Sequence, residues 1–245
     1  MEHDEYRRMF EEEDRYWWFV AKRALVRSLV ERYATRPSAV AIDVGCGTGG
    51  TLQAFSPLGG VWVGVERSEL GLQFGRKRGL PRLLQASAEA LPVRSGAVDL
   101  LLCLDVLYHR GVADDRTALA ECFRVLKPGG TVVITDSALQ WLRGPHDEAV
   151  HARKRYHLDE IADLVGGSGL TIIKRSYANS LLFLPMAGYR LLRRWLPRQD
   201  SGSDITALPR PIQTILGAVM RLERWMLRWT NLPIGTSVIV VAQKL

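Results

Sequence analysis

The chain has 245 residues, 47% of them apolar and 24% charged, which is the composition of an ordinary globular protein with room for a sizeable core. Its formal net charge of +7 allows a nucleic acid, a membrane surface or a small anion as partner. The arginines concentrate in residues 143–155 and 190–228, and no arginine–glycine tract or nucleic-acid motif is present. This distribution favours a membrane or a small anionic substrate over nucleic acid.

The cysteines and the N-terminal segment bear on the cellular compartment. Cys46, Cys103 and Cys122 lie in apolar or glycine-rich surroundings without metal-ligand spacing, which is typical of a reducing cytoplasm. Residues 1–18 are acidic and aromatic, and they lack the basic and apolar regions of a signal peptide. We therefore expect a cytoplasmic protein, with membrane association left open.

The first predicted element is a helix over residues 4–34, which Pro37 ends, and residues 1–36 are expected to form an N-terminal helical cap. Aromatic side chains, including Tyr16 and Trp17, lie in its first half. Such aromatics either anchor a helix against the core, which is the commoner case, or line a substrate site.

Strands and helices then alternate along the chain. Apolar, β-rich runs predict five strands, at residues 38–44, 61–66, 81–86, 97–105 and 131–137. Helices are predicted between them at residues 49–55, 68–79 and 114–130. This order predicts a doubly wound α/β sheet with right-handed crossovers.

The last part of the chain adds a helix, two strands and an insertion. The helix is predicted at residues 157–169 and the strands at 170–178 and 236–245. Residues 178–235 lack strand character and contain two helical stretches, 184–196 and 211–230, around a polar break at 199–204. We expect a single domain, residues 1–245, in which residues 178–235 form an α-helical lid.

The glycine-rich stretch 41–50 fits two different cofactors. It satisfies the dinucleotide fingerprint G-x-G-x-x-G and, with Asp43, the pattern D-x-G-x-G-x-G. Glu66, at the end of the second predicted strand, would accept ribose hydroxyls in either case. Asp43 favours the second pattern, because a carboxylate beneath the loop repels a pyrophosphate and attracts an ammonium group.

Five motifs in a fixed order carry a family resemblance: DVGCGTG, VGVERS, AEALP, LCLDVLYH and LKPGG. Over residues 38–137 the chain closely resembles the class I S-adenosylmethionine-dependent methyltransferases. The resemblance implies a Rossmann-like, seven-stranded mixed sheet with an antiparallel last strand, and S-adenosyl-L-methionine as cofactor. More loosely, the N-terminal segment and residues 143–160 are similar to bacterial methyltransferases that act on lipid, glycan or secondary-metabolite substrates.

The resemblance also implies which residues hold each part of the cofactor. The implied contacts are Asp43 with the amino group, Gly45, Cys46, Gly47 and Gly49 with methionine and ribose, Glu66 with the ribose hydroxyls, Arg67 beside adenine, Ser87, Ala88 and Glu89 at the adenine edge, and Leu104 and Asp105 over the methionine end. The family commonly has Asp where Ser87 stands, so weaker adenine anchoring is expected.

Three histidines are candidates for acid–base chemistry, because methyl transfer to a hydroxyl needs alignment and removal of a proton. His109, at the end of the fourth predicted strand, is either a base or a helix-capping histidine, and Tyr108 beside it is expected to be a pocket wall. His146, Asp147 and His151 follow the fifth strand. They form either a paired set of side chains that acts as a general base or a metal site. No metal is expected, because a fourth ligand is missing.

The same loop carries Arg153, Arg155 and Tyr156, which are candidate substrate residues. The carboxyl ends of strands line the crevice of an open α/β sheet, so this loop is expected near the site. The two arginines either grip a phosphate or carboxylate or belong to a solvated loop.

The predicted helix 211–230 is amphipathic. Its apolar stripe consists of Ile215, Val219, Leu222, Met226 and Trp229, and a second face carries Arg221, Arg224 and Arg228. Such a helix either packs against the core, which is the commonest case, covers the active site, forms a dimer contact or lies on an anionic membrane.

We therefore expect methyl transfer from S-adenosylmethionine to a small-molecule or lipid-like acceptor, at oxygen more than at nitrogen or carbon. DNA base methylation is disfavoured, because LDVLYH replaces the asparagine–proline–proline–aromatic signature of amino-methylating enzymes. Two alternatives are a non-catalytic cofactor-binding partner subunit and, less favoured, a nicotinamide-dependent oxidoreductase.

Overall fold

The computed structural model describes residues 2–34, 39–193 and 208–245. Over these residues the strands are β1 (Val40–Val44), β2 (Val61–Glu66), β3 (Leu83–Gln85), β4 (Val98–Leu104), β5 (Leu126–Ser137), β6 (Thr171–Ala178) and β7 (Ser237–Gln243). The α-helices are α1 (His3–Glu12), α2 (Trp17–Tyr33), α3 (Gly50–Phe55), α4 (Glu69–Lys77), α5 (Asp115–Val125), α6 (Pro145–Ala149), α7 (Leu158–Gly167), α8 (Phe183–Arg193) and α9 (Arg210–Leu227). Short 3₁₀ turns, η1 (Ser56–Leu58) and η2 (Gln140–Leu142), complete the set.

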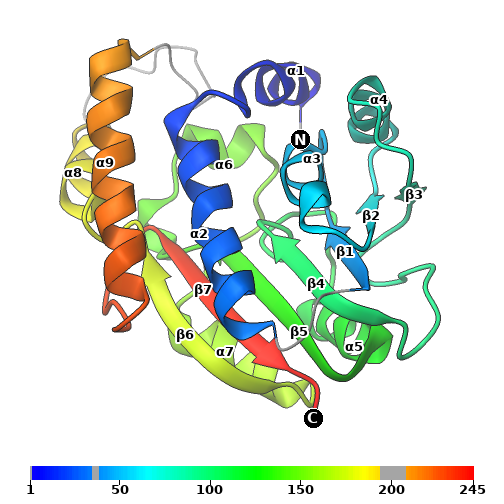
Figure 1. Ribbon diagram of the computed structural model, residues 1–245. Helices are drawn as coiled ribbons and strands as arrows, with labels where there is room; N and C mark the ends of the chain where they lie inside the picture. The colour runs from blue at the N-terminus through cyan, green and yellow to red at the C-terminus, as the bar shows by residue number, and fades with distance from the viewer. Residues whose placement is uncertain (1, 35–38, 194–207) are drawn as a thin grey trace.

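The seven strands form one mixed sheet in the order β3-β2-β1-β4-β5-β7-β6. The first five strands pair in parallel, and β7 runs antiparallel to both β5 and β6 (Figure 1). The predicted doubly wound, seven-stranded sheet with an antiparallel last strand is thus confirmed. Chain order reverses between β1 and β4, and the carboxyl ends of strands at such a switch point form the usual ligand crevice of this sheet type.

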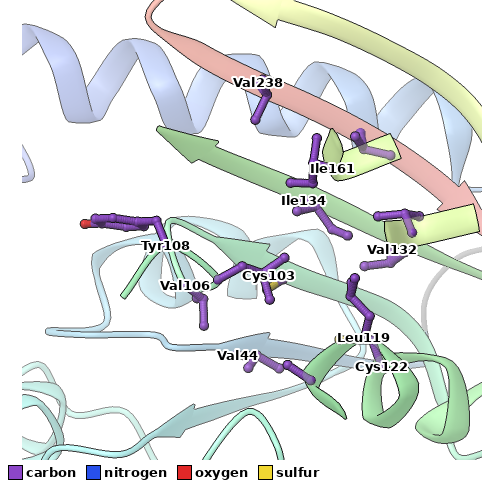
Figure 2. Packing of buried hydrophobic residues seen from close by; sticks show 14 of the residues in the cluster. Val44, Cys103, Val106, Tyr108, Leu119, Cys122, Val132, Ile134, Ile161 and Val238 are labelled. Carbon is purple, nitrogen blue, oxygen red and sulfur yellow. The ribbon is translucent and has the colours of Figure 1, made fainter. Parts of the chain in front are cut away.

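Helices cover both faces of the sheet, so its central strands are apolar along their length. One buried cluster lies on the face covered by α5 and α7, where Cys103, Leu119 and Ile134 pack together (Figure 2). The other lies under α2 and α9, through Val26 and Leu227. In Figure 1 these two helices run side by side across the front of the sheet. Along the described segments, no helix has both the length and the apolar character needed to cross a membrane.

Two predicted helices differ from the structure. The helix expected at residues 4–34 is broken at residues 13–16 into α1 and α2, because the chain turns there to bury Glu13 against Thr48 and Arg78. The helix expected at 114–130 ends at Val125, and the residues after it already belong to β5. Both boundaries are set by contacts with distant parts of the chain. The predicted polar break at 199–204 lies outside the described residues.

Candidate functional site

A large cavity of about 1480 Å³ lies at the carboxyl ends of β1, β2 and β4. Helices α1 and α2 border it on one side and α8 on another. Most of the predicted site residues line it: Asp43, Gly45, Cys46, Gly47, Glu66, Arg67, Ser87, Ala88, Leu104 and Asp105, and also Tyr16, Trp17, Tyr108, His109, His146, His151 and Arg155. The strand ends therefore bring together groups that are far apart in the sequence.

The glycine loop after β1 has a backbone that requires glycine. Gly45 and Gly47 adopt φ values of +70° and +55°, and a Cβ at Gly45 would lie 2.5 Å from Val106 Cγ2. Gly49 also has a positive φ, but it is the N-cap of α3, and a Cβ there would collide with Leu80. Gly49 does not line the cavity, so its role is to shape the turn, in place of the cofactor contact implied by the resemblance.

Glu66 is held with its carboxylate toward the loop. Its Oε2 accepts from the Gly47 N–H at 2.9 Å, and its Oε1 accepts from the Ser68 N–H at 2.8 Å. Each carboxylate oxygen keeps a second lone pair for another donor. Tyr6 of α1 also places its hydroxyl against this carboxylate, and burial, with the charge of Glu66, raises the pKa of Tyr6 to about 12. The arrangement suits Glu66 to vicinal ribose hydroxyls.

Asp43 is a buried carboxylate, only 2% exposed, at the end of β1. It makes no hydrogen bond or ion pair with the residues that the structure describes. Burial raises its pKa to about 7, an effect that Lys22 opposes and Glu66 enhances. Lys22 itself pairs with Asp105 across the cavity. An unpartnered buried carboxylate fits a ligand that carries a cation, as the ammonium end of S-adenosylmethionine does.

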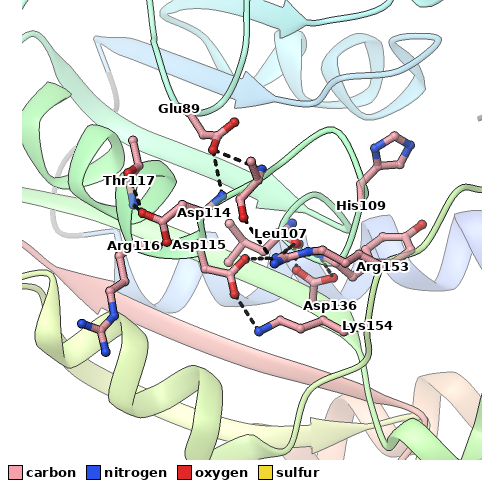
Figure 3. Close-up of polar contacts among 12 residues, drawn as sticks. Glu89, Leu107, His109, Asp114, Asp115, Arg116, Thr117, Asp136, Arg153 and Lys154 are labelled. Atoms are coloured by element: carbon pink, nitrogen blue, oxygen red, sulfur yellow. Dashed lines mark hydrogen bonds and ion pairs between the residues drawn. The ribbon is translucent and has the colours of Figure 1, made fainter.

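The residues after β3 divide into cavity wall and support. Ser87 and Ala88 line the cavity, as the resemblance implies. Glu89 does not, because its Oε1 accepts from the Ala113 N–H at 3.1 Å and the Asp114 N–H at 2.8 Å (Figure 3). Glu89 therefore anchors the loop before α5 and does not form the adenine edge.

His109 is fixed by the chain around it. Its Nδ1 accepts from the Gly111 N–H at 2.9 Å, so the neutral ring carries its proton on Nε2. Burial and the nearby cations lower its pKa to about 4. The His151 ring lies 6.1 Å away, centroid to centroid, and its pKa is also lowered, mainly by desolvation. Both histidines are thus neutral near pH 7, and His109 presents a donor.

The loop after β5 is organised by ion pairs. Arg155 Nε and Nη2 donate to the Asp147 carboxylate at 2.8 and 3.0 Å, and both side chains are buried. Arg153 pairs with Asp115 and donates to Leu107 O at 3.3 Å (Figure 3). Both guanidinium groups bond to protein acceptors, and only Arg155 lines the cavity. Binding of a phosphate or carboxylate by Arg155 stays a prediction, whereas Arg153 lies outside the cavity wall.

Two other predictions for this loop also change. Tyr156 is fully buried in the core and does not line the cavity, although the sequence groups it with substrate residues. Asp147 is taken up by Arg155, so the alternative of a metal held by Asp147 and the neighbouring histidines loses its central ligand. Within residues 2–34, 39–193 and 208–245, no group of three His, Cys, Asp or Glu side chains is placed to hold a metal ion.

Sequence reasoning missed the polar residues that α1 and α2 add to the site. Tyr6 reaches Glu66, Glu13 bonds to Thr48 at the glycine loop, and Lys22 meets Asp105. The only sequence signal was charge within an aromatic, apolar stretch, which does not reveal a partner 83 residues away.

Comparisons with known proteins agree with this geometry. Residues 42–134 match the family model of a methyltransferase domain. Over 157 residues the chain is 34% identical to a ubiquinone biosynthesis O-methyltransferase of Methylococcus capsulatus. The match covers 53% of this chain and 65% of that relative. The chain therefore spans slightly less than two thirds of that relative's length.

Solved structures share the fold over most of the chain. One is the complex between the Haloferax volcanii Trm112 methyltransferase activator and the putative methyltransferase, with a TM-score of 0.62, 17% identity, and coverage of 98% of this chain and 94% of that one. Another is the [4+2]-cyclase SpnF, with a TM-score of 0.60, 20% identity, and coverage of 93% and 82%. These likenesses show the fold alone, which different reactions share.

The sheet order and the cavity at its switch point define a class I, Rossmann-like methyltransferase fold. Residues 42–134 match the methyltransferase-domain family within this fold, and the cofactor of the domain is S-adenosylmethionine.

Proposed function

We propose that the protein transfers the methyl group of S-adenosylmethionine to an oxygen of a small, lipid-like acceptor. The observation that carries the proposal is the continuity of the cavity. It runs from Asp43 and Glu66 at the cofactor loop to Leu182 and Met186 at α8. One end is anionic and suits the cofactor. The other combines the apolar side chains of Leu182 and Met186 with Tyr189 and Arg190, which suits a lipid-like acceptor that carries a polar group.

The helical segments around the sheet have separate roles in this proposal. Residues 1–36 act as a cap over the cofactor end, because Tyr6 and Glu13 contact Glu66 and the glycine loop. Residues 178–235 act as a lid over the acceptor end, because the described part of this segment supplies apolar wall residues.

The chemistry follows from the groups on the wall. The bound cofactor supplies an electrophilic methyl group on a sulfonium. Asp43 and Glu66 orient the cofactor by its ammonium and ribose. His109 Nε2–H donates to the acceptor oxygen and aligns it, while His151, neutral because its pKa is lowered, takes the hydroxyl proton. In this arrangement the base role predicted for His109 moves to His151, because the Nε2 of His109 is the protonated nitrogen.

Two further facts support oxygen as the methylated atom. The curated relative from Methylococcus capsulatus is an O-methyltransferase by name, and so is a second relative, from Bordetella avium, which is 31% identical over 97 residues. A hydroxyl also needs a neutral base beside it, and the cavity wall holds two histidines that burial keeps neutral.

The experiment measures methyl transfer from labelled S-adenosylmethionine to a panel of hydroxylated aromatic and polyprenyl amphiphiles. We expect His151→Ala to lower the transfer rate ~10²-fold with unchanged cofactor affinity. His109→Ala loses alignment, so it should raise KM and lower kcat less than His151→Ala does. His157→Ala, at an exposed position before α7, is the matched control and should change neither.

An unchanged rate in His151→Ala would remove that residue from the mechanism. Tight binding of S-adenosylhomocysteine without transfer to any acceptor of the panel would favour a non-catalytic cofactor-binding subunit. Tight binding of NAD without response to S-adenosylhomocysteine would favour an oxidoreductase.

A further inference from the structure

Helix α9 presents an apolar face to the outside of the molecule. Ile215, Leu222, Trp225 and Trp229 are 63%, 53%, 59% and 72% exposed. Their spacing of seven, three and four residues places them on one side of the helix and the turn that follows it. Two indole rings and two branched aliphatic chains are thus left in solvent along one line.

This face is not the packing face of the helix. Met220, Glu223 and Leu227 are the buried residues of α9, and Leu227 packs in the apolar cluster between the sheet and α2. Of the apolar stripe predicted from the sequence, Val219 and Met226 are partly covered, whereas the residues of the outer line are exposed. Packing against the core therefore explains the inner side of α9 and leaves its outer side unexplained.

The exposed charged side chains of α9 are all positive. Arg221, Arg224 and Arg228 lie on the adjoining side of α9, and none of them forms an ion pair with a described residue. The only acid of the helix, Glu223, is buried, where it accepts from the Asn179 N–H at 2.5 Å and the Leu181 N–H at 2.9 Å. The exposed surface of α9 consequently carries arginines and no carboxylate.

These arginines border a groove of about 350 Å³ between α2 and α9. On the α2 side it is lined by Arg27 and Glu31, which pair at 2.8 Å, and Trp225 forms part of its wall. The groove therefore combines guanidinium donors, which suit a phosphate, with an indole at the edge of the apolar face. The two features are continuous, because Trp225 belongs to both.

We propose that the outer face of α9 docks on an anionic phospholipid bilayer, with the helix lying in the plane of the interface. The apolar line enters the boundary between headgroups and acyl chains, where tryptophan is favoured, and the arginine groove takes lipid phosphates. Charge complementarity identifies the occupant. Four arginines line the groove against the single carboxylate of Glu31, which is paired with Arg27, and this net positive surface matches a negatively charged bilayer better than a second copy of itself.

Docking in this way brings the membrane beside the acceptor end of the large cavity. Leu216, on the inner side of α9, lines that cavity, as do Leu182, just before α8, and Met186 on α8. One helix thus borders the cavity with one side and, in this proposal, the bilayer with another. The docking surface does not depend on the chemistry of the cavity. Membrane binding and the proposed methyl transfer can therefore be tested separately, and failure of one leaves the other unaffected.

The test is co-sedimentation of the full chain with vesicles of phosphatidylcholine alone or mixed with phosphatidylglycerol, at low and high salt. We expect binding to the mixed vesicles at low salt and its loss at high salt. Arg221→Ser with Arg224→Ser should weaken binding roughly 30-fold, since each arginine near an anionic surface contributes about a factor of five. Trp225→Ala with Trp229→Ala should abolish binding.

The matched control is Arg82→Ser with Arg116→Ser, which removes the same charge from exposed positions elsewhere and should bind as the wild type does. Circular dichroism and cofactor binding show that each variant is folded. Equal binding of the control and the α9 arginine variant would overturn the proposal. So would absence of binding at low salt, or a concentration-dependent dimer that the double tryptophan variant dissociates.

Discussion

Asp43→Asn should make the cofactor-free protein more stable while weakening its hold on the cofactor. Burial raises the folded-state pKa of Asp43 from 3.8 to about 7. The unfolded chain ionises this group near its ordinary pKa, so the folded state loses stability as the pH rises from about 4 to about 7. An asparagine of the same shape cannot ionise and avoids that loss.

The size of the effect follows from the shift in pKa. About three pH units correspond to about 4 kcal/mol in the free energy of unfolding at pH 8, and this is an upper limit because relaxation and water entry lower the cost of a buried charge. Below pH 4 the carboxyl is protonated in both states, and the advantage of the variant should vanish. The difference between variant and wild type must therefore grow with pH.

The assay is urea unfolding of both proteins at pH 4 and pH 8 without ligand, with S-adenosylhomocysteine affinity measured by calorimetry at pH 8. We expect the variant to lose affinity by about tenfold or more, since an ammonium ion loses its charged partner. Asp99→Asn is the matched control and should have the opposite effect on stability. The ion pair with Lys127 helps to lower the pKa of Asp99, so removing this pair should destabilise the folded protein at pH 8. If Asp43→Asn were less stable than the wild type at pH 8, or bound S-adenosylhomocysteine with unchanged affinity, Asp43 would not be a buried, unpaired carboxylate that holds the ammonium group.

Three other substitutions or profiles test separate parts of the structure. Gly45→Ala should destabilise by about 1–3 kcal/mol and weaken S-adenosylhomocysteine binding, because the position has a positive φ and faces Val106, and thermal unfolding with calorimetry measures both. Asp147→Asn should cost about 3–5 kcal/mol in urea unfolding at neutral pH by leaving Arg155 buried without a counter-ion. The pKa of Asp147 is lowered, so this cost should shrink on acidification, and a cost independent of pH would argue against the ion pair. If His151 is the base, kcat/KM should stay level on acidification to below pH 6.5, and a fall centred at or above 6.5 would contradict its lowered pKa.

The sheet and the centre of the cofactor site were predictable because their signals are local. Each parallel strand is a short apolar run, and the strands alternate with helices in the order that this fold uses. Gly45, Gly47 and Glu66 follow from backbone and charge requirements at the ends of two neighbouring strands. These requirements are visible in a few consecutive residues.

The features that escaped prediction depend on contacts across the fold. Glu89 looks like an adenine ligand in the motif, yet its carboxylate caps two backbone N–H groups of a loop that comes 24 residues later. Arg155 resembles a solvent-facing or ligand-binding residue until Asp147 is placed beside it in the core. Similarly, the helix predicted over residues 4–34 is broken between α1 and α2, because Glu13 is buried there in an ion pair with Arg78. No local pattern reports such pairings.

The proposed function is tested most directly by following the isotopically labelled methyl group of S-adenosylmethionine into a hydroxylated, lipid-like acceptor. Mass spectrometry of the organic-phase product identifies the atom that carries the label. We expect the label on the oxygen of a methyl ether or methyl ester. The wild type should form this product, and its yield should fall strongly in Glu66→Ala, which lacks the carboxylate that holds the ribose. Label on nitrogen or carbon, or no labelled product from a protein that binds the cofactor tightly, would contradict the proposed function.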